Sequence, residues 1–196
     1  MIKKRLLVGA IALCAALLVW VTFFWHPENG RLAQPPKGGD FTLRSAAGTL
    51  SLHDLRGKVV LLYFGYTMCP DICPTSLTFT AQGLAQLDAK ELEKVQMLFV
   101  TVDPERDTLE HLKLYTAFFH PNITGLTGTP EEIARAAKLY GASYAKQQMG
   151  SAAGYVVDHT ADTYVIAPDG SLYATLPHAT PPGIVAETLR AALKLH

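Results

Sequence analysis

The hydrophobic and polar positions divide the chain into three parts. Residues 6–25 are apolar except for Gly9 and Thr22, residues 26–40 hold three Pro and three Gly without apolar periodicity, and regular apolar segments follow. A largely apolar stretch of about 20 residues is long enough to cross the hydrocarbon core of a membrane as a helix. The pattern predicts a cytoplasmic N-terminus and transmembrane anchor over residues 1–25, a flexible tether over residues 26–40 and one folded domain over residues 41–196.

Within the predicted domain, strand-like and helix-like segments alternate. Continuous apolar runs rich in β-branched and aromatic residues predict strands that are buried on both faces. Thr108 is expected to cap one helix, and Pro130 to occupy the first turn of another. The expected elements are strands over residues 58–65, 95–102 and 123–126, helices over residues 75–94, 108–119, 129–140 and 181–195, and a hairpin over residues 164–174. This order predicts an α/β, thioredoxin-like fold, in which helices flank a central mixed sheet.

Composition and charge narrow the classes of function. Beyond residue 25, about 44% of the residues are apolar, as in an ordinary soluble domain. Lys3, Lys4 and Arg5 precede the apolar run, so the remainder of the chain holds more acidic than basic residues. A nucleic-acid-binding domain usually shows a basic excess, and we therefore expect no nucleic-acid partner.

The same three basic residues predict how the apolar segment is oriented. Positive charges favour the cytoplasmic side, so residues 41–196 are expected on the periplasmic (extracytoplasmic) side of the cytoplasmic membrane. A cleaved signal peptide is the alternative, but the run ends in Phe-Phe-Trp-His-Pro, which suits a signal peptidase poorly. We favour a retained single-pass anchor, in which Cys14 is a small apolar filler of the helix.

Two further cysteines stand where the first predicted strand meets a helix. Cys69 and Cys73 are four positions apart in the sequence YTMCPDICP. On a helix, this spacing would place both sulfurs on one face, and the helix N-terminus would lower the pKa of a thiol. Two such thiolates bind a soft metal ion or form a disulfide. A structural disulfide or a pair of buried thiols is the alternative, although a cross-link across so short a loop stabilises little.

Three blocks of sequence resemble the Sco/SenC family. They are YFGYTMCPDICP at residues 63–74, VDPERDT at residues 102–108 and DHT at residues 158–160, and they occur in the order found in that family. The resemblance extends from about residue 39 to the C-terminus. It implies a membrane-anchored copper protein of thioredoxin fold that helps to assemble the binuclear CuA centre of cytochrome c oxidase.

The resemblance also implies a ligand set and partners. Cys69, Cys73 and His159 match the copper ligands of the family. Two thiolates and one imidazole form a low-coordinate site suited to Cu(I), and the imidazole also allows Cu(II), whereas zinc would usually take a fourth protein ligand or a water. The implied partners are the oxidase subunit that carries the CuA site and a copper donor protein.

The residues around these ligands carry further expectations. Asp71 is either an acceptor for a metal ligand or a solvated carboxylate, and Arg106 and Asp107 either pair with each other or cap the next helix. Asp103 is expected to shape the loop near the site, and Met68 to have an ordinary packing role. The other histidines are expected to be solvated; they are His26, His53, His111, His120, His178 and His196.

Two classes of function remain. A copper chaperone would bind the ion and transfer it without turnover, whereas a thiol–disulfide oxidoreductase would use Cys69 and Cys73 as a redox pair that keeps the cysteines of the target reduced. The CxxxC spacing and the distant His159 favour the chaperone, because disulfide exchange needs no imidazole. A peroxidase is a more distant interpretation, suggested by Thr67 but lacking the proline expected a few residues earlier.

Overall fold

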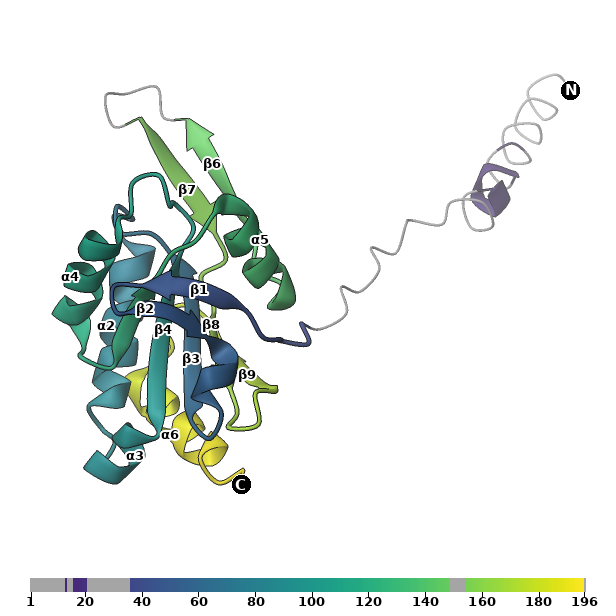
Figure 1. Ribbon diagram of the computed structural model, residues 1–196. Helices are drawn as coiled ribbons and strands as arrows, with labels where there is room; N and C mark the ends of the chain where they lie inside the picture. Colours follow the sequence, from purple (N-terminus) through teal and green to yellow (C-terminus); the bar gives the residue numbers. More distant parts are fainter. Residues whose placement is uncertain (1–12, 14–15, 21–35, 149–153, 196) are drawn as a thin grey trace, which may run out of the picture. The chain divides into compact units, whose positions relative to one another are not determined.

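The computed structural model describes residues 13, 16–20, 36–148 and 154–195. The chain divides into two units, and the second unit, Pro36–His196, carries the fold (Figure 1). Most of the predicted anchor and tether lies outside the described residues. The described residues of the anchor, 13 and 16–20, are helical. Within the described part of the chain, no helix is both long and apolar enough to span a membrane.

The second unit is a succession of short strands and helices. In chain order they are β1 (Thr42–Ser45), β2 (Gly48–Ser51), the 3-10 helix η1 (Leu52–Leu55), β3 (Val59–Gly65), α2 (Ile72–Leu84), α3 (Ala89–Glu93), β4 (Val95–Thr101), α4 (Leu109–Phe119), β5 (Ile123–Leu126), α5 (Pro130–Leu139), β6 (Tyr144–Gln148), β7 (Tyr155–His159), β8 (Thr163–Ile166), β9 (Leu172–Leu176) and α6 (Pro182–Ala192).

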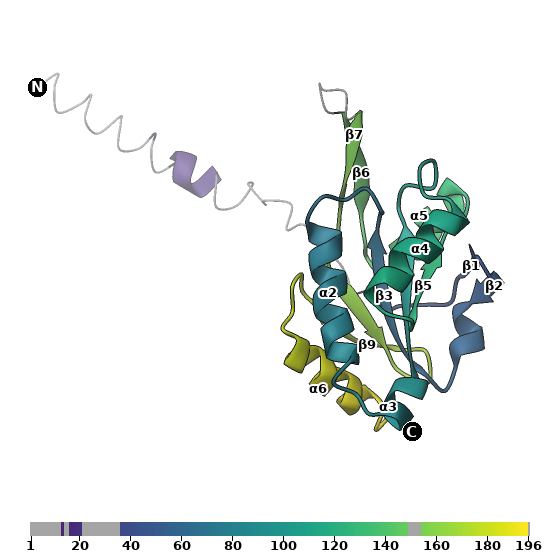
Figure 2. The same cartoon turned by 90° about the vertical axis from the view of Figure 1, so that its left-hand side faces the viewer.

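A five-stranded mixed sheet in the order β5-β4-β3-β8-β9 forms the centre of this unit. Strands β3, β4 and β5 are parallel, and β8 and β9 run antiparallel to their neighbours. Every residue of β3 is buried, because strands pair with both of its edges and other elements cover both of its faces. The β1–β2 hairpin lies on one side of the sheet, and α2 and α6 on the other (Figure 2). This architecture agrees with the predicted thioredoxin-like α/β fold.

Neighbouring residues of β3 contact opposite layers, as the two-residue period of a strand requires. Tyr63 stacks on Phe99 of β4, whose ring lies 5.5 Å from that of Tyr115 on α4. Phe64 instead contacts Tyr140, just after α5, at a ring-centroid distance of 6.4 Å. Aromatic side chains therefore fill both faces of the sheet beneath the strand that leads to the cysteines.

Side-chain caps begin the helices α3, α4 and α5. The hydroxyl oxygen of Thr108 accepts a backbone N–H bond at the start of α4, as predicted, and Pro130 is the first residue of α5, also as predicted. The hydroxyl oxygen of Thr129 caps α5. The single helix predicted over residues 75–94 is wrong, because α2 and α3 are separate. The side chains of Asp88 and Glu91 form a capping box that begins α3, a signal that the helical pattern concealed.

A second hairpin, β6–β7, extends away from the central sheet and forms a two-stranded sheet of its own (Figures 1 and 2). Neither this hairpin nor β1–β2 was expected. Four of the five residues of β6, YAKQQ, are exposed, so the strand lacks the alternation of apolar and polar residues that predicts a half-buried strand. His159 is the last residue of β7, so this hairpin carries the histidine that the sequence indicated as a ligand.

Candidate metal centre

The two cysteines lie at the junction between β3 and α2. Cys73 is in the first turn of α2, and Cys69 is in the turn before the helix; 0% and 7% of their surfaces are exposed. The backbone N–H of Cys73 donates a hydrogen bond to the Cys69 sulfur over 3.4 Å. The expectation that both cysteines share one helical face is wrong, because α2 begins only at Ile72. The turn, and not helical periodicity, brings the sulfurs together.

Close packing fixes the Cys73 sulfur against the end of β3. A Cβ atom at Gly65 would lie 2.8 Å from the Cys73 sulfur and 2.9 Å from ring atoms of Phe99 and Tyr63. No side chain fits there, so glycine is the residue that lets the sulfur approach the strand this closely.

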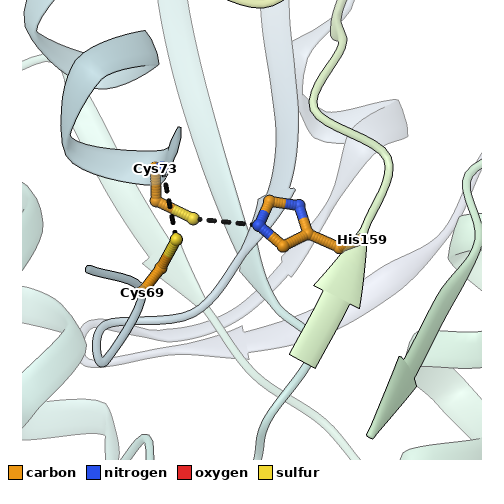
Figure 3. A group of neighbouring side chains, drawn as sticks. All are labelled: Cys69, Cys73 and His159. Atoms are coloured by element: carbon orange, nitrogen blue, oxygen red, sulfur yellow. Dashed lines mark hydrogen bonds between the residues drawn. The ribbon is translucent and has the colours of Figure 1, made fainter. Parts of the chain in front are cut away.

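His159 reaches the cysteines from β7. Its Nε2 lies 3.2 Å from the Cys73 sulfur (Figure 3). Its Nδ1 lies 3.0 Å from the carbonyl oxygen of Thr160. Because a carbonyl oxygen only accepts, we assign the proton to Nδ1, which leaves the lone pair of Nε2 facing the sulfurs. The imidazole stands edge-on to the rings of Tyr63 and Tyr66, at centroid distances of 6.0 and 5.9 Å.

The three side chains form a cluster that could hold a metal ion. One ligand atom each from Cys69, Cys73 and His159 lies within 4.8 Å of the other two. Metal bonds to sulfur and imidazole nitrogen of about 2.0–2.3 Å, as known for zinc, span ligand separations of up to about 4.5 Å. The cluster therefore needs only a small contraction to surround one ion.

Hydrogen bonding and burial separate the two thiols. The pKa of Cys69 is lowered to about 3, chiefly because the Cys73 side chain donates a hydrogen bond to its sulfur, and also because backbone N–H groups at the start of α2 do so. Burial raises the pKa of Cys73, and the neighbouring Cys69 sulfur raises it further. The reduced, metal-free cluster therefore holds one thiolate and one thiol, and a metal ion that binds both sulfurs displaces the Cys73 proton.

The flanking residues differ in how well they match expectation. Asp71 is exposed and accepts a hydrogen bond from the Thr75 hydroxyl, which agrees with the solvated alternative. The packing role expected for Met68 is wrong, because the turn directs this side chain outward and leaves it 59% exposed. His53, His111 and His178 are exposed as predicted, His120 is half-buried, and His26 and His196 lie outside the described residues.

The segment between β4 and α4 contacts the parts of the chain around the metal-ligand cluster. Arg106 and Asp107 neither pair with each other nor cap the helix, so both expectations for them are wrong. Arg106 pairs with buried Asp103. Asp107 is also buried, and it accepts hydrogen bonds from the backbone N–H of Thr67 at 3.1 Å and from the hydroxyl of Thr101 at 2.6 Å. The sequence shows these charges but gives no signal for partners that are distant along the chain.

Three known proteins are each similar to this chain over about four fifths of its length or more. The mitochondrial SCO2 homolog of Bos taurus is 39% identical over 179 residues, which cover 86% of this chain and 67% of that protein. The solution structure of apo Sco1 from Thermus thermophilus is 41% identical, with a TM-score of 0.73 over 80% of this chain and 91% of that chain. The structure of Bradyrhizobium japonicum ScoI with copper bound is 36% identical, with a TM-score of 0.72 over 79% of this chain and 98% of that chain.

The family model described as SCO1/SenC matches residues 29–194, a range that contains all three residues of the cluster. The match covers the central sheet, the turn that carries Cys69 and Cys73, and the hairpin that carries His159. This chain is therefore a member of the SCO1/SenC family.

Proposed function

We propose that this protein is a copper chaperone for cytochrome c oxidase. It binds one copper ion through Cys69, Cys73 and His159 and passes that ion to the CuA centre of the oxidase during assembly. The observation that carries the proposal is the convergence of two sulfur atoms and one imidazole nitrogen within 4.8 Å. Family membership supports it, because the Bradyrhizobium relative is a structure with copper bound.

The donor set favours copper over other common metal ions. Thiolate is a soft ligand that selects Cu(I), and imidazole extends the range to Cu(II). A structural zinc site is almost always four-coordinate, whereas the cluster in the described residues offers three ligand atoms.

The arrangement also suits an ion that must leave again. Cys73 is closed to solvent, whereas Cys69 lies in a turn and His159 lies at the end of a hairpin outside the main sheet. An acceptor protein can therefore approach from the side of Cys69 and His159 and replace the ligands one at a time. The copper ion is cargo in this scheme, and the protein itself is unchanged by its transfer.

The deciding experiment uses His159→Ala. If copper transfer is the task, this variant loses one of three ligands, and cytochrome c oxidase activity falls in membranes of a strain that lacks the native gene. The variant protein must reach the same abundance as the wild type, measured by immunoblot. Near-normal oxidase activity at equal abundance overturns the chaperone proposal, because the cysteines alone then suffice.

The low pKa of Cys69 supports a second function, thiol–disulfide exchange. In this scheme the Cys69 thiolate attacks a disulfide of the target, and Cys73 then resolves the mixed disulfide. The target disulfide gains two electrons and becomes one thiol and one thiolate, which takes a proton from water, and a Cys69–Cys73 disulfide forms here. His159→Ala leaves these steps intact, so the same experiment separates the two functions. A peroxidase is less well supported, because the Thr67 hydroxyl donates to Asp107.

The placement of the protein in the cell is part of the same proposal. Residues 1–25 would anchor it in the cytoplasmic membrane, residues 26–40 would form the tether, and residues 41–196 would work on the periplasmic side. The apolar run and the three basic residues before it support this arrangement. The partners would be a copper donor protein and the oxidase subunit that carries the CuA site.

A further inference from the structure

We propose that Asp103, Arg106 and Tyr155 form a clasp that positions His159 for copper. This inference rests on the proposed function, because it explains what orients His159, the third of the proposed copper ligands. The clasp lies at the opposite end of β7 from the imidazole, so its residues are positioning residues that act through the strand.

The β6–β7 hairpin needs an attachment of this kind. Its strands pair only with each other, as a two-stranded sheet outside the five-stranded one. A two-stranded hairpin by itself is marginally stable in water. The orientation of His159 at the end of β7 therefore depends on contacts between the hairpin and the rest of the domain.

The clasp supplies part-buried, charge-assisted contacts. The Tyr155 hydroxyl donates to the Asp103 carboxylate over 2.7 Å, and Arg106 donates from its Nη1 to the backbone carbonyl oxygen of Tyr155 over 3.1 Å. The Nε of Arg106 also bonds the Asp103 carboxylate, whose side chain is fully buried. The Arg106 guanidinium lies over the Tyr155 ring, 3.8 Å from its centroid. Hydrogen bonds that involve charged groups are about twice as strong as neutral ones, so these contacts hold β7 firmly.

The strand transmits this placement to the imidazole. Val157 and His159 are less exposed than Asp158 between them, and Tyr155, two positions before Val157, contacts the domain through its hydroxyl, as expected for residues on one face of a strand. Tyr66 extends the contact along that face: its hydroxyl accepts the backbone N–H of Val157 at 3.3 Å, and its ring lies against His159. The same ring lies 5.7 Å from the Arg106 guanidinium. One continuous contact between β7 and the domain therefore extends from the clasp at one end of the strand to the imidazole at the other.

The test is a double-mutant cycle on the full-length protein, with Cu(I) titrated against a chromogenic chelator. Tyr155→Phe removes only the hydroxyl that bonds Asp103, which makes it the mildest change to the clasp. It is expected to lower Cu(I) affinity by about 10-fold, the lower end of the range for residues that orient metal ligands. In a His159→Ala background, the same change is expected to have no effect, since the clasp then has no ligand to position.

A matched control uses the half-exposed Tyr173 on β9. Tyr173→Phe makes the same chemical change away from the hairpin and is expected to leave Cu(I) affinity unchanged. A loss for Tyr155→Phe that is equally large in both backgrounds would show a general effect on the fold and would overturn the clasp proposal. Unchanged affinity in Tyr155→Phe would overturn it as well.

A measurement without metal separates this inference from the proposed function. The aromatic rings of Tyr63 and Tyr66, which stand edge-on to the imidazole, are expected to shift the NMR signals of the His159 ring protons. Tyr155→Phe is expected to move these signals toward their values in an unstructured peptide, and Tyr173→Phe is expected to leave them in place. If the wild type binds no Cu(I), the proposed function fails, and the metal-free spectra still decide whether the clasp positions His159. Identical spectra for wild type and Tyr155→Phe would contradict the clasp.

Discussion

The central sheet and the β6–β7 hairpin hold the metal ligands by different means. Both cysteines adjoin β3, a strand buried along its whole length, and Cys73 packs against the core itself. His159 belongs to a separate hairpin, which contributes Val157 to the core and is otherwise held by a few polar and aromatic contacts. The free energy gained by burying apolar surface is large and changes little when atoms shift slightly, whereas the strength of a hydrogen bond depends on its distance and angle. The thiol pair is therefore formed together with the fold, and the imidazole depends on a second, weaker attachment.

The largest expected difference between the regions is in folding stability. Phe64→Ala, which removes a ring that is 1% exposed in β3, is expected to cost about 3–5 kcal/mol in the free energy of unfolding. Val156→Ala in the half-buried part of β7 is expected to cost about 1 kcal/mol or less. Urea titrations followed by circular dichroism measure both. Equal losses in the two variants would mean that the hairpin is as much a part of the core as β3.

Copper affinity sharpens the same comparison. Cys73→Ser is expected to abolish measurable Cu(I) binding, because it removes a soft thiolate from the part of the site formed by the fold. His159→Ala is expected to weaken binding by at least about 10-fold, because substitution of a residue that only orients a metal ligand already costs that much. The two thiolates still hold the ion. Chelator competition measures both affinities, with circular dichroism to verify folding. Full loss of binding in His159→Ala would show that the imidazole is no weaker a partner than the sulfurs.

Hydrogen exchange compares the two regions without any substitution. Amides of β3 are expected to exchange only through global unfolding, since the strand is buried and paired on both edges. Amides of β7 are expected to exchange about 10-fold faster or more, through local opening of the hairpin. Mass spectrometry of peptides from residues 59–65 and 155–159 gives the two rates. Matching rates would place the hairpin in the same cooperative unit as the sheet.

The two thiols are expected to differ in their reaction with iodoacetamide. Cys69 has a pKa lowered to about 3, so its alkylation rate is expected to stay nearly constant from pH 5 to pH 8. Cys73, with a raised pKa and no exposed surface, is expected to react far more slowly. The sign follows from the lowered pKa: the contacts that favour the Cys69 thiolate stabilise the fold fully above the unfolded pKa of about 8.5, and this contribution is lost as the pH falls toward 3. A 10-fold rise in the Cys69 rate per pH unit would contradict the thiolate assignment.

The smallest effect is expected at the exposed ion pair between hairpin and domain. Lys146 of β6 contacts Glu105 at 2.7 Å, and 38% and 65% of their side-chain surfaces are exposed. Such pairs contribute little because water and salt screen them, so Lys146→Ala is expected to leave Cu(I) affinity unchanged within twofold. The measurement is the same chelator competition. A loss of affinity as large as that of Tyr155→Phe would mean that this surface ion pair attaches the hairpin as strongly as the clasp does.

The two regions also differ in how far the sequence predicts them. β3 is a continuous apolar run, and the two cysteines follow within a few residues, so local patterns indicate both the strand and the candidate soft-metal pair. His159 stands 86 residues from its sulfur partner. The mostly polar sequence of β6 gives no strand signal, because pairing with β7 and not burial forms it. Only the resemblance to a family connected His159 to the cysteines.

The contacts of the clasp were beyond prediction for a related physical reason. Asp103 and Arg106 look like ordinary loop charges, and their partner Tyr155 lies about 50 residues further along, on the unpredicted hairpin. Met68 shows the converse error. Its apolar side chain suggests packing, but the turn into α2 points it outward. Side-chain direction in irregular turns follows backbone geometry, which residue type alone does not reveal.

The alternation of residues along β7 limits how this part of the chain can change in length. Tyr155 and His159 face the domain from the same side of the strand, separated by an even number of positions. A single-residue insertion or deletion between them would turn either the tyrosine or the imidazole to the solvent side. An insertion of two residues would keep both facing inward, but it would displace one of them by about 6.6 Å along the strand. The spacing between these two residues is therefore a length constraint on any engineered or natural variant that is to keep all three ligands together.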